Sequence, residues 1–274
     1  MKPRTFPVTR FLAPDIGIDL GTMHTRVCVP GEGIVLDEPT LVAVEQGSRR
    51  VLHRGQAVGH LAKMMQGRTP ESIRTIRPVR CGAVADHESG EAMLRAFLRK
   101  AHPRSWGLLP RVLIAVPGGI TPVERQAVLN TTARAGARQV FLIRKSLAAA
   151  LGVGLPIAEP VASMICDLGG GMSEIAIVCL GEVTVSESLR VAGDELDLAI
   201  IDYLRCKHRL RVGQQMAERI KVEIGTVMPL EIELTLEVGG RDLVTGLPRK
   251  MALTSEEVRV ALHDPVRMIV AGIQ

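Results

Sequence analysis

Two short stretches of the chain share an Asp-Leu-Gly run suited to holding phosphate. They span residues 17–25 (GIDLGTMHT) and 165–173 (ICDLGGGMS). Each reads as an apolar strand, the Asp-Leu-Gly run, a small turn, a hydroxyl residue and a second strand. Successive N–H groups of a glycine turn form a concave anion site, and an aspartate beside it can hold a hard cation through water. One copy is a weak signal, but the pair predicts two facing hairpins that clamp a nucleotide and its cation.

The composition is that of a globular protein with an aliphatic core. The chain has 274 residues, of which 46% are hydrophobic and 23% charged, enough for one large domain or two medium ones. Aromatic residues make up only 2%, which argues against a stacking platform for single-stranded nucleic acid. The net charge of +5 comes from scattered Lys and Arg residues, so we expect no nucleic-acid partner.

The five cysteines form no CxxC or Cys/His ligand spacing. Cys28, Cys166 and Cys179 lie in apolar runs and are predicted to be small core residues. The sequence shows no secretory signal and no apolar run long enough to span a bilayer, so a reducing cytoplasm is the expected compartment.

Hydrophobic periodicity and caps place these motifs on alternating strands and helices. Strands are predicted at 15–20, 25–29, 33–36, 40–45, 112–116, 140–143, 163–180 (a hairpin), 183–189 and 230–238. Helices are predicted at 59–65, 88–101, 146–151, 194–207 and 214–224, and after the capping boxes Thr121–Glu124 and Thr254–Glu257. Pro265 is expected to interrupt the last helix. The repeated order implies two α/β lobes around a cleft.

These motifs resemble the MreB family of bacterial actins, within the superfamily of actin, heat-shock chaperones and sugar kinases. The supporting runs include residues 31–39 (GEGIVLDEP), 68–70, 76–78, 91–94, 110–112, 116–117, 119–121, 123–125, 147–150, 154–156, 191–197, 218–221 and 242–248. They extend over nearly the whole chain from Asp15 onward. The resemblance implies an actin-like, ribonuclease H-like α/β fold with two lobes, the second incomplete.

The implied domains are an irregular tail (1–14), a first lobe (15–152) with a small insert at 41–75, and a second lobe (153–274). The second lobe has a small subdomain at 189–251 and lacks the family's closing segment, which carries a second glycine-rich adenosine loop. The tail is either frayed or a weak basic-apolar membrane contact, although its prolines oppose an amphipathic helix.

The resemblance also implies ATP and Mg²⁺ as cofactors, with Asp19 and Asp167 organising the Mg²⁺ through water. The phosphates would be wrapped by Gly21, Thr22, Met23 and His24 from one turn, and by Gly169, Gly170, Gly171, Met172 and Ser173 from the other. Glu218 and Lys221 would touch the ribose and base, although without the resemblance they read as an exposed i, i+3 pair. His24 is either a phosphate donor or an ordinary surface histidine.

Several positions depart from the family pattern. The family's Glu-Glu-Pro reads Arg144-Lys145-Ser146 here, and a cation cannot accept a proton from the attacking water. Met172 replaces a threonine, and Met23-His24 replaces a small residue and an amide. We therefore predict nucleotide binding with weakened hydrolysis, at most a weak ATPase, and assign no catalytic residue.

The resemblance implies a cytoskeletal protein that forms membrane-associated filaments and helps determine rod shape and cell-wall organisation. Its implied partners are itself or a full-length MreB as polymer, cell-wall elongation proteins and the inner face of the cytoplasmic membrane. Trp106, Leu108 and Leu109 lie on a predicted loop that either contacts membrane or folds back on the core.

Other functions stay open. The chain is alternatively a regulator or degenerate paralogue that neither polymerises nor hydrolyses nucleotide and binds a full-length MreB. A sugar kinase would need a sugar site with an Asp base, and a chaperone would need a substrate-binding domain after the ATPase. Neither feature appears in the sequence.

Overall fold

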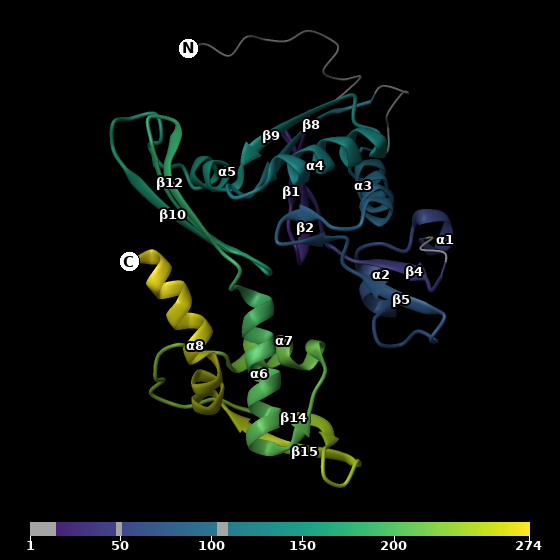
Figure 1. The fold of residues 1–274 in the computed structure, drawn as a ribbon, viewed down its shortest axis with the longest axis vertical. Coiled ribbons are helices and arrows are strands. Elements are labelled where there is room, and N and C mark those ends of the chain that lie inside the picture. The colour runs from purple at the N-terminus through teal and green to yellow at the C-terminus, as the bar shows by residue number, and fades with distance from the viewer. Residues whose placement is uncertain (1–14, 48–50, 103–108) are drawn as a thin grey trace. The chain divides into compact units, whose positions relative to one another are not determined.

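The computed structural model describes residues 15–47, 51–102 and 109–274, and it divides the chain into two compact units (Figure 1). The first unit runs up to Gly169 and also includes Glu174–Ser188. The second comprises Gly170–Ser173 and Leu189–Gln274. The strands near residues 163–188 therefore group largely with the first unit.

A five-stranded sheet forms the centre of the first unit, in the order β3-β2-β1-β8-β9. Its strands are β1 (Asp15–Leu20), β2 (His24–Val29), β3 (Gly33–Pro39), β8 (Arg111–Val116) and β9 (Gln139–Arg144). β1 pairs antiparallel with β2 and parallel with β8, which itself pairs parallel with β9. Asp19 consequently lies at the end of the central strand, with Arg26 and Ala115 as its neighbours in register.

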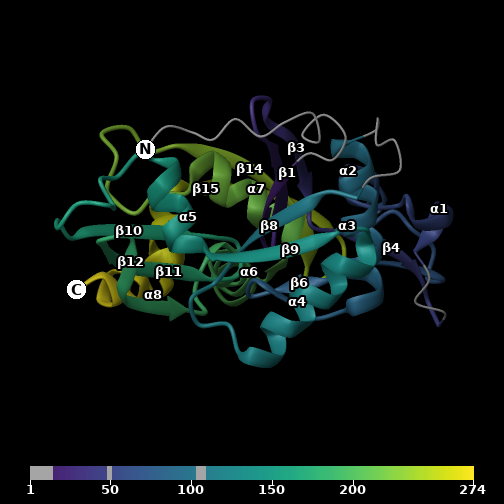
Figure 2. The same cartoon turned by 90° about the horizontal axis from the view of Figure 1, so that it is seen from above.

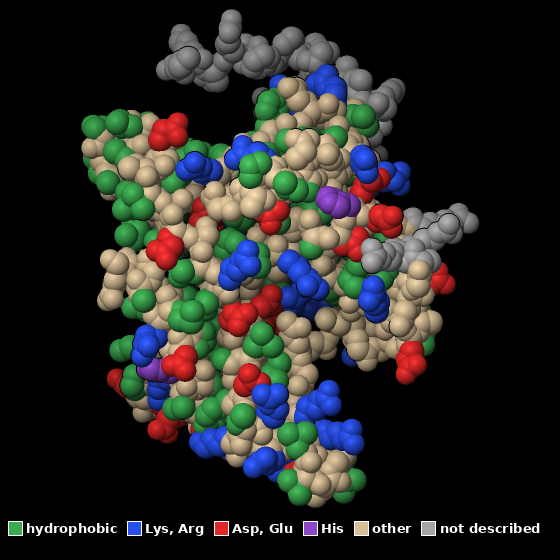
Figure 3. All heavy atoms as spheres, viewed as in Figure 1, with side chains coloured by type: hydrophobic (Ala, Val, Ile, Leu, Met, Phe, Trp, Pro, Cys, Tyr) green, Lys and Arg blue, Asp and Glu red, His purple; other side chains and the backbone are tan. Residues whose placement is uncertain are grey.

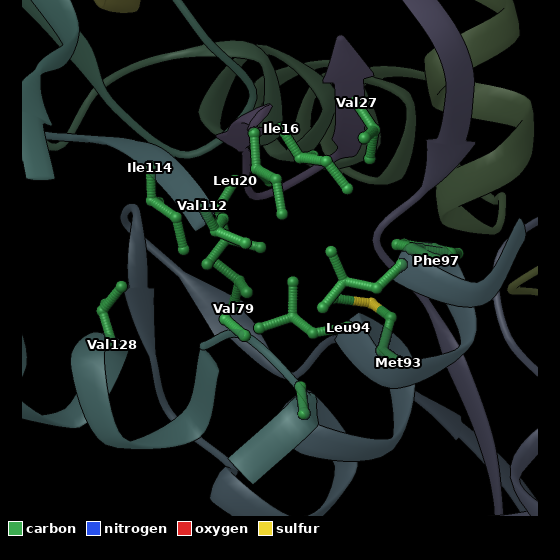
Figure 4. Close-up of a cluster of buried hydrophobic side chains, with 14 of the residues drawn as sticks. Ile16, Leu20, Val27, Val79, Met93, Leu94, Phe97, Val112, Ile114 and Val128 are labelled. Atoms are coloured by element: carbon green, nitrogen blue, oxygen red, sulfur yellow. The ribbon is translucent and has the colours of Figure 1, made fainter. Parts of the chain in front are cut away.

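The core of the first unit lies where this sheet meets α3 (His87–Ala101) and α4 (Pro122–Ala135), which contact each other (Figure 2). Alternate residues of β1 are buried, as are several apolar side chains of α3, and these side chains point toward one another (Figure 4). The members labelled there include Ile16, Leu20, Met93, Leu94, Phe97, Val112 and Ile114. The capping box predicted at Thr121 and Glu124 is confirmed.

Smaller elements complete this part of the first unit. β4 (Val42–Glu45) pairs antiparallel with β5 (Ile73–Ile76) and contacts α1 (Leu52–Gly55) and α2 (His60–Met65). β6 (Val79–Arg80) and β7 (Ala83–Val84) form a second two-stranded ladder.

A three-stranded sheet follows α5 (Lys145–Gly152), in the order β10-β11-β12. Its strands are β10 (Ser163–Leu168), β11 (Ser173–Cys179) and β12 (Glu182–Leu189). β11 is mostly buried, but large apolar side chains on β10 and β12 are exposed, including Met164, Leu168 and Val185. Figure 3 shows apolar side chains gathered over this sheet, at the upper left of the view.

The cysteine prediction was wrong in part. Cys28 and Cys166 are exposed and Cys179 is half-buried. On β2 and β10 the two exposed thiols fall on the outward side of an alternating strand, because successive side chains of a strand point to opposite faces. An apolar run in the sequence does not distinguish these two faces.

The second unit packs three helices with a small antiparallel sheet, in the order β13-β14-β15. Its helices are α6 (Gly193–His208), α7 (Gln214–Ile224) and α8 (Ser255–Ile273), and its strands are β13 (Leu210–Arg211), β14 (Thr235–Asp242) and β15 (Pro248–Thr254). Its core is aliphatic and includes Ile200, Leu204, Ile220 and Val238. The capping box at Thr254 and Glu257 is confirmed.

The strand predicted at 230–238 was wrong in its first half, because β14 begins only at Thr235. The two residues before it, Glu233 and Leu234, bond to α8 instead of to a neighbouring strand. The Leu234 N–H donates to the Ser255 hydroxyl at 2.9 Å, and Arg259 pairs with Glu233 at 2.7 Å. These contacts hold the segment against a helix end despite its alternating pattern.

Pro265 does not interrupt the last helix, since α8 continues through it to Ile273. Proline removes one backbone donor inside a helix, but buried contacts on both sides can compensate. Val258 and Leu262 lie buried before Pro265, and Ile269 lies buried after it. None of the helices in the described parts of the chain is long and apolar enough to cross a bilayer.

Candidate phosphate site

The first Asp-Leu-Gly turn joins β1 to β2 and closes very tightly. The Gly21 N–H donates to the His24 carbonyl oxygen at 3.1 Å. A Cβ atom at Gly21 would lie only 2.5 Å from that oxygen, closer than real Cβ contacts allow. Glycine is therefore required here by the close approach of the two strands, in addition to any role toward a phosphate.

The other predicted phosphate residues of this turn already have partners in the first unit. Thr22 is buried, and its hydroxyl oxygen accepts a long 3.4 Å hydrogen bond from the Gly82 N–H. The Met23 carbonyl accepts from the Thr40 N–H at 2.8 Å. The His24 side chain, by contrast, is 38% exposed.

His24 faces Asp37 on the adjacent strand. Its Nδ1 lies 2.9 Å from Asp37 Oδ1, and Arg26 Nε lies 3.1 Å from Asp37 Oδ2. The hydrogen bond with His24 lowers the pKa of Asp37, with help from Arg26 and against the opposing effect of burial. Asp37 therefore stays ionised and competes with any phosphate for His24.

In the second turn, Asp167 belongs to the end of β10, whereas Gly170–Ser173 belong to the second unit. The Gly170 carbonyl accepts from the Asp194 N–H at 2.7 Å. The buried Ser173 hydroxyl donates to the Val191 carbonyl at 2.6 Å. Because a hydroxyl has one proton to donate, Ser173 in this arrangement has none left for a phosphate oxygen.

Lys145 joins the two aspartates that the sequence places in separate motifs. Its Nζ lies 3.0 Å from Asp167 Oδ2 and 3.7 Å from Asp19 Oδ1. The second oxygen of Asp19 is 3.8 Å from an Arg26 guanidinium nitrogen. Asp19 Oδ1 is buried and has no hydrogen-bond partner, so its charge is balanced by these cations without direct donors.

The charge of Lys145 is held in place by its surroundings. Burial is the largest single effect and lowers the pKa of Lys145, but Asp19, Asp167 and Glu174 together outweigh it and raise that pKa above its ordinary value. The ammonium is therefore protonated at neutral pH. Glu174 is itself buried, with one oxygen 3.3 Å from the donating Gly118 N–H and the other without a partner.

The carboxylates of Asp19 and Asp167 do not form a site for Mg²⁺ while Lys145 is in place. Mg²⁺ takes a near-ideal octahedron of oxygen ligands at about 2.0–2.1 Å and usually keeps several waters, so even when held through water it needs the space between the carboxylates. Here an ammonium already lies against both carboxylates. Within the residues that the structure describes, no cluster of three or more His, Cys, Asp or Glu side chains is arranged for a metal.

The sequence predicted Asp19 and Asp167 but missed how Lys145 links them. Lys145 begins α5 directly after β9, the strand that pairs with β8 beside β1. A cation in the family's acidic slot was the available signal. Only the fold shows that its ammonium lies close to both aspartates. The neighbouring Arg144 is exposed and instead donates to the Val183 carbonyl at 3.4 Å.

Glu218 and Lys221, predicted to contact the ribose and base, lie on α7 in the second unit. Lys221 Nζ is 2.7 Å from Asp197 Oδ1 and donates to the Gly193 carbonyl at 2.9 Å. Asp197 is almost fully buried, and its pKa is raised by burial, by Glu218 and by Asp194, against the lowering effect of Lys221. Lys221 therefore tethers α7 to α6.

Of the predicted membrane loop, Trp106 and Leu108 lie outside the described residues. Leu109 is described and half of its surface is exposed.

Known proteins resemble the chain over almost its full length. A family model described as MreB/Mbl protein matches residues 13–274. The chain is 45% identical over 260 residues to the cell shape-determining protein MreB of Escherichia coli K12, covering 94% of this chain and 75% of that protein. It is 41% identical over 258 residues to the cell shape-determining protein Mbl of Bacillus subtilis 168, covering 94% and 76%.

Solved structures agree. MreB5 of Spiroplasma citri bound to ADP superposes with a TM-score of 0.88 at 33% identity, covering 95% of this chain and 77% of that one. A double helical filament of MamK gives a TM-score of 0.76 at 19% identity, covering 95% and 78%, which supports the fold alone. The predicted actin-like α/β fold is confirmed.

Proposed function

Because this chain belongs to the MreB/Mbl protein family, we propose that it is a cytoskeletal filament subunit that binds an adenine nucleotide and hydrolyses it weakly or not at all. The observation that carries the proposal is the Lys145 ammonium beside Asp19 and Asp167. It keeps a cation at the predicted phosphate site while removing an acid from the slot where hydrolysis would need one.

Nucleotide binding is supported by the structural neighbours. Two MreB5 structures of Spiroplasma citri are bound to ADP and to AMPPNP. We carry this binding over to the present chain, with phosphates near Asp19, Asp167 and their glycine turns. In this proposal Glu218 and Lys221 contact the ribose and base, and Lys221 keeps its ion pair with Asp197.

Weak hydrolysis is expected because the described residues at the family's acidic slot include no suitable general base. A general base must accept a proton from the attacking water. Lys145 is protonated, the Arg144 guanidinium offers only N–H donors, and Glu174 is 2% exposed. We therefore expect the site to hold the phosphate groups without activating a water molecule to attack them.

A phosphate-release assay tests the proposal, with the MreB of Escherichia coli K12 as reference. We expect nucleotide binding in calorimetry together with phosphate release far below that of the reference. Release at the reference rate would overturn the proposed loss of hydrolysis. Absence of binding to ATP and ADP would overturn the nucleotide site itself.

Polymerisation is proposed from membership of the MreB/Mbl family, whose relatives are described as cell shape-determining proteins, and head-to-tail contacts that do not close make filaments. Sedimentation with and without ATP tests it, for the chain alone and mixed with a full-length relative. We expect the chain to pellet alone. A chain that pellets only with the relative would instead be a regulator that binds a full-length MreB.

We also propose that the chain acts at the inner face of the cytoplasmic membrane, with cell-wall elongation proteins as partners in shape determination. The support is the relatives' description as cell shape-determining proteins and the exposed Leu109. Liposome co-sedimentation tests the membrane part. The triple variant W106A, L108A and L109A should reduce binding, and unchanged binding would show that the loop does not contact lipid.

A further inference from the structure

We propose that the Lys145 ammonium takes the place of the divalent cation, so that this chain binds nucleotide phosphates without Mg²⁺. The inference rests on the proposed nucleotide site and adds the cation requirement of that site. It concerns which cation neutralises the carboxylates of Asp19 and Asp167, a question that does not depend on whether the nucleotide is hydrolysed.

The position of the ammonium supports this assignment. Lys145 Nζ lies 3.0 Å from one aspartate and 3.7 Å from the other, so it occupies the space in which a shared cation would lie. A divalent ion placed there would meet the ammonium at short range, and like charges in a partly buried site repel strongly. The two carboxylates can therefore bind Mg²⁺ only if Lys145 leaves.

Lys145 is also held where it is. As the first residue of α5 it follows β9 without a loop, and the next residue, Ser146, is fully buried. Only about a quarter of the Lys145 side chain is exposed. Leaving would expose three acids to one another, because Asp19, Asp167 and the buried Glu174 all attract this one ammonium.

The same ammonium can serve a phosphate. A lysine ammonium carries three N–H donors and is a common phosphate ligand. One of these N–H donors is used by Asp167, whose Oδ2 lies 3.0 Å away. Asp19 Oδ1 lies beyond hydrogen-bond range, at 3.7 Å. Donors therefore remain for phosphate oxygens, and these oxygens would meet a fixed positive charge that needs no ion from solution.

Binding of Mn²⁺ alone, followed by electron paramagnetic resonance of the free ion, tests the inference without any nucleotide. The wild-type chain should leave Mn²⁺ free. Lys145→Glu removes the ammonium and adds a third carboxylate, so it should bind Mn²⁺ at least about tenfold more tightly than the wild type. Wild-type binding as tight as that of the variant would overturn the inference.

Arg144→Glu is the matched control, since it makes the same charge change one residue earlier, where the side chain faces Val183. It should leave Mn²⁺ free, and if it gained binding equal to that of Lys145→Glu the inference would fail. Circular dichroism checks that both variants fold. If Lys145→Glu does not fold, Lys145→Gln provides the same comparison, with a smaller expected gain.

A second measurement uses ATP, in EDTA and in excess Mg²⁺. Wild-type affinity should agree within about twofold between the two, whereas Lys145→Glu should lose about tenfold or more in EDTA. A tenfold loss for the wild type in EDTA would overturn the inference. If neither protein binds ATP under either condition, the proposed function fails, and the Mn²⁺ measurement alone still decides the role of Lys145.

Discussion

The two Asp-Leu-Gly hairpins have the same sequence pattern but very different surroundings. Leu20 and Leu168 occupy the same place in the motif, yet Leu20 is 3% exposed and Leu168 is 60% exposed. One position before each aspartate, Ile18 is buried and Cys166 is exposed. The first hairpin is the centre of a sheet covered by α3 and α4, whereas part of the second has an open apolar face. The motif therefore specifies a turn and leaves the packing of its strands to their context.

Replacing each of the two leucines by alanine should give the largest difference in the free energy of unfolding. Leu20→Ala removes a side chain from the core of the first unit and should lower the free energy of unfolding by about 2–5 kcal/mol. Leu168→Ala changes a side chain that is mostly in water, and its effect should stay within about 0.5 kcal/mol. Urea unfolding followed by circular dichroism measures both. Equal losses would show that Leu168 is covered in solution.

The tightness of the first turn gives an intermediate effect. Gly21→Ala brings a methyl group against the His24 carbonyl and forces the backbone to shift, at a cost of about 1–3 kcal/mol. Gly152→Ala, at the end of α5, meets open space and serves as the control. Thermal unfolding compares them. A Gly21 variant as stable as the control would mean that the hairpin relaxes easily and that its glycine serves only the ligand.

The smallest expected effect is on the alkylation rate of Cys166, which lies on the exposed strand of the second hairpin. Although Cys166 is exposed overall, partial burial of its thiol, followed by the charge of Asp167, raises the pKa of this thiol above its ordinary value. A thiol with a raised pKa holds less thiolate at neutral pH, so Cys166 should react slowly with iodoacetamide and faster as the pH rises toward that pKa. Peptide mapping by mass spectrometry resolves it from the other cysteines.

Asp167→Asn removes the smaller of the two causes and should therefore produce a modest increase in the Cys166 rate at pH 8. Asp264→Asn, on the exposed surface of α8, is the control and should leave the rate unchanged. No increase in Asp167→Asn would leave burial as the only cause of the slow reaction. The second hairpin would then be more enclosed than its exposed leucine indicates.

Elements with a strong local signal were predictable from the sequence. Both capping boxes are where Thr121 and Thr254 placed them, because a cap depends on residues three positions apart. Predictions failed where a distant partner decided the outcome. Glu233 and Leu234 bond to α8 in place of a strand, and Pro265 lies in a helix with buried residues on either side of it.

The sequence by itself determined the family, the actin-like fold, the two aspartates at their strand ends and the cation in the acidic slot. The tertiary structure alone decided that Lys145 lies between Asp19 and Asp167. Parallel pairing of β1 with β8, and of β8 with β9, brings the start of α5 beside the end of β1. Interactions between charges weaken with distance and are screened by salt beyond about 10 Å, so what a charge does depends on neighbours that only folding brings near.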